Sequence, residues 1–322
     1  MRTWQRIPAA LLLLALAAAT VSAQNYPSRP IRVIVPQSAG GSTDLAARVV
    51  MQRLDDVFKQ SIVVDNRPGA GSINGTEIVA RSAPDGHTLL AIAASFTITP
   101  ALRKQLPFDP VLDFSPITQL VALPHILVVH PSVPAKSVKE FIALVKSRPG
   151  QINCASSGVG TSTHLAVEQF MYMTGTKMAV IPYKGGAPGN AALVSGEVQA
   201  YFATISTSLP FIKAGRMRAL AVTSARRSTS APEYPTIAES GVPGYEHTSW
   251  VGVMAPGKTP RPIIDRLHAE MVKIIQVPEV KALFLRDGLE IVGNTPQEFA
   301  AIIKDEIARW KTLARVANLP VE

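Results

Sequence analysis

The chain has 322 residues, of which 47% are hydrophobic and 17% charged, a composition that excludes a disordered or fibrous protein. Lysine and arginine number 32 against 23 acidic residues, which gives a net charge of +9. The basic residues are dispersed and aromatic residues make up only 6%, so small anions are favoured over nucleic acid as partners. Alternatively, the positive net charge has no role in binding a partner. The single cysteine, Cys154, excludes an intrachain disulfide and a cysteine-based metal site within this chain.

Residues 1–23 have the pattern of a secretory signal peptide. Arg2 and Arg6 precede a 13-residue apolar stretch, and Val21-Ser22-Ala23 supplies small residues for cleavage after Ala23. As a helix the apolar stretch would span about 20 Å, too short for a hydrocarbon core of about 30 Å. We therefore expect a soluble protein exported to the periplasm, which carries a charge of +7 once both leader arginines are removed. An uncleaved anchor is the alternative. The periplasm lacks ATP and nicotinamide cofactors, and we expect no cofactor.

The first part of the mature chain alternates strands and helices. We predict strands over Ile31–Val35, Ser61–Val64 and Thr88–Ala93, and helices over Thr43–Lys59 and Asn74–Ser82. This order of strand, helix, strand, helix and strand is typical of a parallel sheet with helices on its faces.

A second α/β unit begins near residue 125, and a helical tail follows it. The pattern predicts strands over Ile126–Val129, Gln151–Ala155, Met178–Pro182, Val198–Ala203 and Met217–Thr223, with helices over Ser137–Ser147, Ser162–Thr174 and Ala187–Ser195. Three further helices are predicted from Thr259 to Ile275, from Pro278 to Gly288 and from Pro296 to about Ala317. We therefore expect two lobes, one of residues 24–125 and 246–322 and the other of residues 126–245. Their cleft is where a ligand would bind.

The loop Pro36–Asp44 is the most informative segment. It lies between a strand and a helix, and Gly40 and Gly41 allow backbone N–H groups to converge on a small anion. Ser42 and Thr43 add hydroxyl donors. An ordinary turn, in which Ser42 merely caps the helix, is the alternative.

Two other loops have a similar design. Ser156–His164 again joins a strand to a helix and offers small residues, hydroxyl groups and His164, which could equally be a structural residue near a helix start. In the loop Tyr183–Pro188, the Tyr183 ring could form one side of a ligand site and Lys184 could attract an anion. The alternative for Lys184 is a solvent-exposed lysine without a role in binding.

Patterns for catalysis are weak. Gly252–Thr259 formally matches the P-loop, but Pro260 and Pro262 follow at once, whereas a P-loop needs its Lys and Thr inside a helix. Pro36–Gly40 is one residue short of a nucleophile elbow, so a secreted serine hydrolase that uses Ser38 remains a rival hypothesis. The six histidines are scattered without metal-binding spacing, and we expect no metal.

Several motifs in a fixed order give the chain a family resemblance. They are Tyr26–Ile31, Pro36–Asp44, Asn66–Gly71, Pro84–Gly86, Pro182–Gly186, Ala214–Thr223 and Pro235–Gly241. With these motifs the sequence resembles the Bug-type extracytoplasmic solute receptors of tripartite tricarboxylate transporters, over nearly the whole mature chain.

The resemblance implies an α/β fold of the two-lobed periplasmic binding protein type (type II-like), in which each lobe is a mixed, mainly parallel sheet flanked by helices. It also implies that loops from opposite lobes hold a carboxylate, partly through ordered water. The binding residues implied are Gln37, Ser38, Ala39, Gly40, Gly41, Ser42, Thr43 and Asp44 in one lobe, and Ser157, Gly158, Thr161, Ser162, His164, Tyr183 and Lys184 in the other.

Two departures from the family pattern bear on the ligand. Position 37 is usually aromatic in the family but is Gln37 here, and Ala203–Ser206 lacks an aspartate that can meet an amino group. We therefore expect the ligand to be a plain aliphatic or aromatic carboxylic acid.

The function that the resemblance implies is that of a monomeric, non-enzymatic receptor that delivers this acid to membrane transporter subunits. A sensor subunit that binds the same ligands and feeds a signalling protein is a further alternative.

Overall fold

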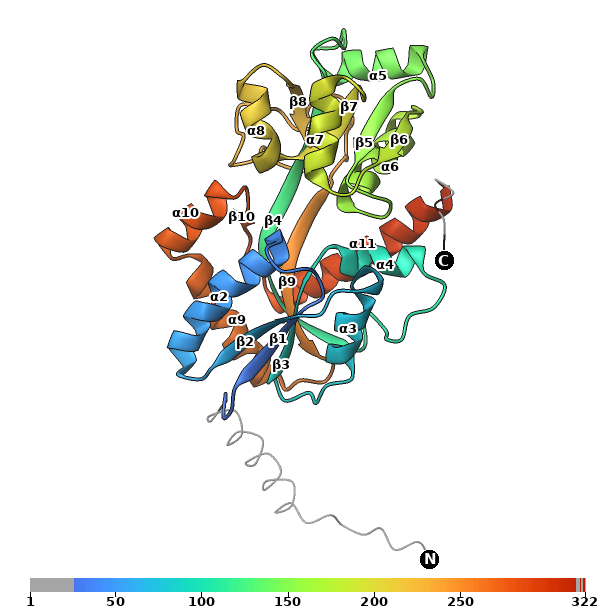
Figure 1. Ribbon diagram of the computed structural model, residues 1–322. Coiled ribbons are helices and arrows are strands. Elements are labelled where there is room, and N and C mark those ends of the chain that lie inside the picture. The colour runs from blue at the N-terminus through green and yellow to red at the C-terminus, as the bar shows by residue number, and fades with distance from the viewer. Residues whose placement is uncertain (1–25, 317–318, 320, 322) are drawn as a thin grey trace, which may run out of the picture.

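The computed structural model describes residues 26–316, 319 and 321, and the predicted leader, residues 1–23, lies outside them. Two lobes are joined by a pair of long antiparallel strands, β4 (Phe114–Val129) and β9 (Thr248–Pro256) (Figure 1). One half of β4 pairs with β9, and the other half pairs with β7 (Ala200–Thr204) and β8 (Arg218–Val222) of the upper lobe. The lobe boundaries predicted near residues 125 and 245 fall within β4 and just before β9, and they remain a proposal.

The lower lobe contains the parallel sheet that the sequence predicts. Strand β1 (Ile31–Val35) pairs in parallel with β2 (Ile62–Asn66) and β3 (Thr88–Ala93). The sheet continues antiparallel through β9 and β4 to the short β10 (Glu290–Ile291). The sheet is therefore parallel at one edge and antiparallel where the lobes join.

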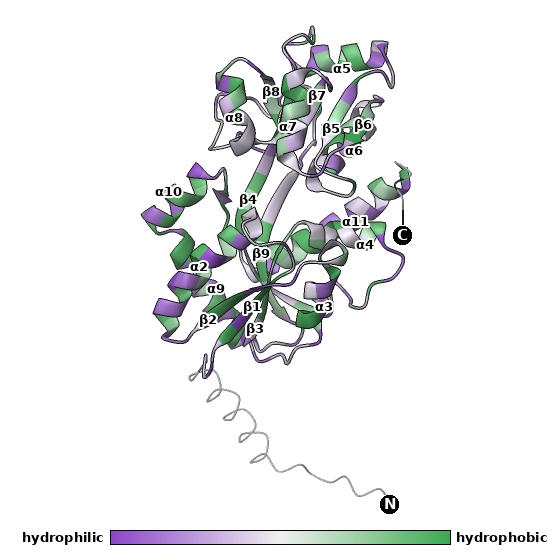
Figure 2. Cartoon of the chain, in the orientation of Figure 1, coloured by the Kyte–Doolittle hydropathy of each residue, from purple (hydrophilic) through white to green (hydrophobic). Residues whose placement is uncertain are grey.

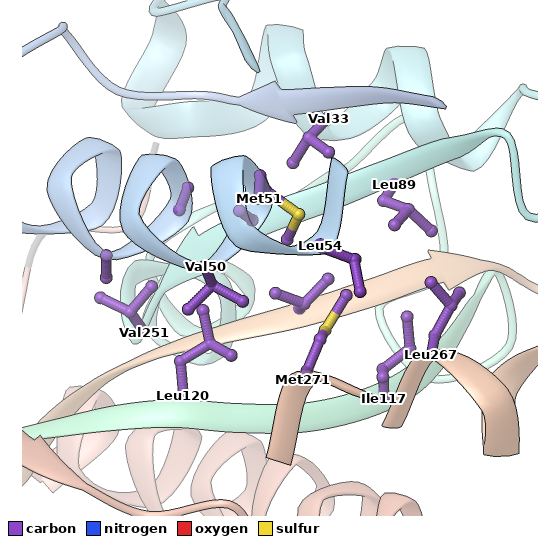
Figure 3. Close-up of a cluster of buried hydrophobic side chains, with 14 of the residues drawn as sticks. Val33, Val50, Met51, Leu54, Leu89, Ile117, Leu120, Val251, Leu267 and Met271 are labelled. Carbon is purple, nitrogen blue, oxygen red and sulfur yellow. The ribbon is translucent and has the colours of Figure 1, made fainter. Parts of the chain in front are cut away.

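Helices cover both faces of the lower sheet. Helices α2 (Ser42–Phe58) and α9 (Arg261–Ile275) bury their apolar faces on one side, and Figure 3 shows Met51 and Leu54 of α2 together with Met271 of α9. The other face packs against α3 (Ile73–Ala80) and α11 (Pro296–Val316). In Figure 2 the strands beneath α2 are mainly hydrophobic, whereas the outer faces of α2 and α10 (Pro278–Arg286) are largely hydrophilic.

The upper lobe repeats this layered arrangement. Strand β5 (Asn153–Ser156) pairs in parallel with β6 (Ala179–Pro182) and with β7. Helices α5 (Val138–Ser147) and α6 (Ser162–Thr174) pack on one face through Phe141 and Phe170. Helices α7 (Gly186–Ser195) and α8 (Ile205–Lys213) cover the other.

Some elements differ from the prediction for physical reasons. Strand β4 begins at Phe114, well before Ile126, and its proline at position 116 and its register shifts against β9 hide the strand pattern. Helices α4 (Ser95–Leu102) and α8 were missed because Pro100 and Pro210 lie inside them and normally interrupt a helix. Helix α9 begins at Arg261, and the Thr259 hydroxyl donates to the Pro256 carbonyl instead of capping it. Within the described residues no helix is long and apolar enough to cross a membrane.

Candidate functional site

A cavity of about 470 Å³ lies between the lobes on one side of the crossing strands. The lower lobe contributes residues from the loop after β1, the 3-10 turn η1 (Ala70–Ser72), the end of β3 and α4, while the upper lobe contributes the loop before α6. The lining residues are Gln37, Gly71, Ser72, Ala93, Ser95, Ile98, Thr99, Leu102, Arg103, Val159, Gly160, Thr161, Ser162 and Ser249. The cavity therefore brings together two of the loops that the sequence singled out.

The chemistry of this lining favours a small anion. Serine and threonine residues come from both lobes, and the lining also includes the basic residue Arg103. No aspartate or glutamate is among the described residues that line the cavity. Hydroxyl groups can donate hydrogen bonds, and a guanidinium matches the geometry of a carboxylate. Leu102 and Val159 supply apolar surface for a carbon skeleton.

The Asp44 side chain is hydrogen-bonded to the loop before α2 and to two neighbouring side chains. The Asp44 carboxylate accepts hydrogen bonds from the Gly40 N–H at 2.9 Å, from Arg48 Nε at 3.0 Å and from Asn66 Nδ2 at 3.0 Å. Burial acts to raise the pKa of Asp44, but these hydrogen bonds outweigh it and hold the pKa below its ordinary value. Asp44 is thus an ionised brace for the glycine turn, in which Gly40 has a φ of +82°.

The first turn of α2 has no side-chain cap. The residue at the N-cap is Gly41, which makes no side-chain hydrogen bond, so the alternative in which Ser42 caps the helix is wrong. Residues Ser38 to Ser42 are exposed, whereas Thr43 and Asp44 are buried. Figure 1 shows this end of α2 directed toward the upper lobe. Uncapped N–H groups at a helix start are a favourable place for an anion.

Gln37 links this loop to the other walls of the cavity. Its Nε2 atom donates to Ser72 Oγ at 3.0 Å and to Ser95 Oγ at 3.4 Å, and its backbone carbonyl accepts from Asn66. Its Oε1 atom is buried and has no partner among the described residues. An aromatic ring could not make these contacts, so Gln37 makes this part of the cavity polar.

The loop before α6 is organised by its own hydroxyl groups. Thr161 is the N-cap, and its Oγ1 accepts from the His164 N–H at 3.4 Å and donates to the Gly158 carbonyl at 2.7 Å. The Ser157 N–H donates to Thr163 Oγ1 at 2.8 Å. The Gly160 N–H donates to His164 Nδ1 at 3.0 Å. His164 is buried, and its Nε2 lies 3.5 Å from a Glu168 carboxylate oxygen, so its ring braces the loop from behind.

Comparison with known proteins identifies the family of the chain. Residues 46–319 match the tripartite tricarboxylate transporter family receptor, TctC. The chain belongs to this family. The Bug protein BugT of Bordetella pertussis is 39% identical to this receptor over 300 residues, which cover 92% of each chain.

Solved structures of two relatives share the fold of the receptor. A protein of R. palustris with adipate is 34% identical, covers 91% of this chain and 99% of its own, and superposes with a TM-score of 0.76. MatC from Rhodopseudomonas palustris with bound malate is 29% identical, covers 89% of this chain and 99% of its own, and has a TM-score of 0.73. The two-lobed fold expected from the sequence is confirmed.

Not every predicted site residue of the receptor lies at the cavity. Gln37, Thr161 and Ser162 line it, while Ser157 and Gly158 shape the loop behind it. Ser38 to Asp44, His164, Tyr183 and Lys184 are not among its lining residues, so Gln37 is the part of the loop before α2 that reaches the cavity. The Tyr183 hydroxyl donates instead to Glu197 at 2.7 Å, and Lys184 is exposed to solvent. Ligand binding by all the predicted residues remains a prediction.

Several lining residues were missed by sequence reasoning. Ser72 follows the Asn66–Gly71 turn, a family motif from which the sequence predicts no contact with the ligand. Ser95, Thr99 and Arg103 belong to the region of α4, which Pro100 concealed. The end of the well-predicted strand β3 at Ala93 was the available signal, because ligands bind beyond the carboxyl ends of strands in α/β sheets.

The motifs for other functions have structural roles in the receptor. The P-loop match is not a P-loop, because Gly252 to Pro256 form part of β9. Ser38 is exposed, and no hydrogen bond joins its side chain to a histidine in the part of the chain that the structure describes. The same residues contain no group of three His, Cys, Asp or Glu side chains that could hold a metal ion.

Proposed function

We propose that this receptor captures a small organic carboxylate in the periplasm and presents it to the membrane subunits of a tripartite tricarboxylate-type transporter. The observation that carries the proposal is the cavity between the lobes, whose described lining contains serine and threonine residues and Arg103 but no acidic side chain. The members of this family are receptors of tripartite tricarboxylate transporters. Structures of two relatives contain the carboxylates adipate and malate.

Export and the lack of catalysis belong to the same proposal. A signal peptide cleaved after Ala23 would deliver a soluble monomer to the periplasm, where relatives of this family act as binding proteins. The receptor would bind its ligand and release it unchanged. A test for hydrolysis of ester substrates should find no turnover, and turnover that Ser38→Ala abolishes would support the rival hydrolase.

Binding would exchange water around the carboxylate for protein donors. Charge-assisted hydrogen bonds to hydroxyl and N–H groups contribute about 1.5–3 kcal/mol each. The donors come from both lobes, so their full set is within reach only when the lobes approach. The ligand would therefore shift the population toward a closed form, which the transporter subunits can distinguish from the open one.

The lining also limits the class of ligand. A free amino acid carries an ammonium group, which needs an acceptor or a carboxylate partner when it is desolvated. The absence of acidic side chains among the described lining residues supports a carboxylic acid without an amino group. The stretch Ala203–Ser206, which lacks the aspartate that the family resemblance implies for many members, points the same way.

A thermal-shift screen tests the proposal. A carboxylate present at 100 times its dissociation constant should stabilise the protein by about 2.7 kcal/mol, whereas the matching amino acids should have little effect. Arg103→Gln should weaken binding of the same carboxylate about tenfold or more. Arg315→Gln on the exposed end of α11 is the control and should leave it unchanged. A panel of mono-, di- and aromatic carboxylates without any stabilising member would contradict the proposal.

A further inference from the structure

Ser162 is hydrogen-bonded to two buried histidines. Its Oγ lies 2.9 Å from His125 Nε2 and 2.8 Å from His247 Nε2. Ser162 begins α6 and lines the cavity, whereas the histidines belong to the segments that join the lobes. His125 follows Pro124 on β4, His247 precedes Thr248 on β9, and Pro124 and Thr248 are register partners. The start of α6 is thus anchored to both crossing segments through one hydroxyl group.

Both imidazole rings are neutral near pH 7. The rings stack with centroids 5.7 Å apart, and each is buried. Burial lowers the pKa of His125 to about 4. Burial also lowers the pKa of His247 well below its ordinary value, and the neighbouring His125 and the Arg309 guanidinium act in the same direction, whereas a hydrogen bond to the Ser162 backbone acts in the opposite direction without outweighing them. The indole of Trp310 covers His247 with centroids 5.3 Å apart. Each ring therefore carries a single N–H.

The surroundings decide which ring nitrogen carries that hydrogen. The Nδ1 atoms of His125 and His247 are both buried and have no hydrogen-bond partner among the described residues. A buried N–H without an acceptor is rarer in proteins than a buried acceptor without a donor. The favoured arrangement places both protons on Nε2, where each N–H donates to the Ser162 oxygen.

This arrangement fixes the direction of the Ser162 hydroxyl. A serine oxygen can accept two hydrogen bonds and donate one. Two imidazole donors occupy both acceptor positions, so the Ser162 O–H is left for the cavity that Ser162 lines. We propose that His125 and His247 are positioning residues that fix Ser162 as a hydrogen-bond donor toward the ligand and thereby favour acceptor groups such as carboxylates over donor groups such as ammonium. The ligand part of this inference rests on the proposed function.

The protonation pattern can be tested without any ligand. Nitrogen-15 NMR of the labelled protein at pH 7 distinguishes the two neutral tautomers of each histidine. We expect His125 and His247 both to carry the proton on Nε2. A proton on Nδ1 of either ring, or a charged ring, would overturn the inference because Ser162 would then have to donate to a ring or lose a partner. This outcome does not depend on whether the protein binds carboxylates.

The role in binding can be tested with paired variants and adipate as the probe in calorimetry. Ser162→Ala and His125→Leu should each raise the dissociation constant about tenfold, and the double variant should lose no more than Ser162→Ala, because His125 acts through Ser162. His125→Gln should retain near-normal affinity, since its amide can supply an N–H where Nε2 lies. Ser195→Ala on α7, outside the cavity, is the control.

Three results would overturn the binding role: unchanged affinity in Ser162→Ala, additive losses in the double variant, or no rescue by His125→Gln when circular dichroism shows a native fold. If the wild-type protein does not bind adipate, adipate is not a ligand of this receptor and the binding part of the inference is overturned for it. The tautomer measurement then still decides whether Ser162 is a fixed donor.

Discussion

Gly41 is the N-cap of α2 and has no side chain in front of the first turn. Its φ of −80° suits any residue, and an added Cβ would meet only the Ser38 carbonyl oxygen at 3.6 Å. A valine should therefore leave the fold intact, with a change in unfolding free energy below about 1 kcal/mol. Its side chain would stand in front of the uncapped N–H groups and weaken carboxylate binding about tenfold or more. Calorimetry combined with thermal melting checks both effects, and unchanged affinity would show that these N–H groups do not hold the anion.

The buried His125 makes stability depend on pH. Its pKa is about 4 in the folded protein against an ordinary value of 6.5, so the unfolded chain binds more protons between these pH values. Above pH 6.5 His125 is neutral in both states and does not lower the free energy of unfolding. As the pH falls from 6.5 toward 4, protonation of this histidine in the unfolded chain lowers the free energy of unfolding. Between pH 7 and pH 5 this loss should be about 2 kcal/mol.

Urea unfolding of the wild type and of His125→Gln at both pH values measures this effect. The variant should lose less stability on acidification, although His247, whose pKa is lowered in the same direction, keeps part of the dependence. Equal losses in both proteins would show that His125 does not cause the acid sensitivity.

At the residue scale the sequence predicted the cavity residues of the loops before α2 and α6 better than the other residues that line the cavity. Thr161 and Ser162 follow a strand and start a helix, so their place at the cavity can be inferred from local pattern. Ser249 and Arg103 could not be inferred in this way, because tertiary folding alone brings β9 and α4 to the same cavity. The roles of His125 and His247 depend on strand pairing across more than a hundred residues of sequence.

Helix α5 offers a test at the scale of one element. Ser137 Oγ accepts from the Glu140 N–H at 3.2 Å, which confirms the predicted cap, while Glu140 Oε2 accepts from the Lys136 N–H at 2.6 Å. Ser137→Ala should destabilise the protein by about 1 kcal/mol without affecting ligand binding. The control is Ser147→Ala at the other end of α5, which should cost less than about 0.5 kcal/mol. Equal effects in urea unfolding would contradict the importance of the cap.

Elements with strong local signals were predicted to within a few residues. Strand β1 and helix α6 agree with the prediction at both ends, since each has a clear pattern of apolar residues between loops rich in small residues. Strand β4 was predicted only in its last residues, because it is buried along nearly its whole length and therefore lacks the alternation of a one-sided strand. Its role as a connection between lobes is a property of the whole sheet.

At the scale of the whole molecule the lobes touch beside the cavity. Ile98 of α4, Leu165 of α6 and Trp310 of α11 share one buried apolar cluster, so the end of α11 packs against both lobes. Gly160 in the upper lobe approaches Leu102 so closely that an added Cβ would lie 2.8 Å from Leu102 Cδ1. These contacts define one side of the cleft, and closure on a ligand would have to preserve or rearrange them.

A second cavity provides the strongest structural alternative for the ligand. It also measures about 470 Å³ and is lined by Thr248 and Trp250, which flank Ser249 on β9 and face the opposite side of the strand. Arg226, Arg309 and several acidic side chains, among them Glu246, surround it. This mixture of charges is less suited to a carboxylate than the lining around Arg103.

The most direct test of the account is a crystal structure of the receptor with the carboxylate that gives the largest thermal shift. We predict that the carboxylate lies between the first turn of α2 and the start of α6, with one oxygen within hydrogen-bond distance of Ser162 Oγ and the lobes closed around it. A ligand bound in the cavity beside Thr248 and Trp250, or in the predicted cavity without contact to either loop, would contradict the account.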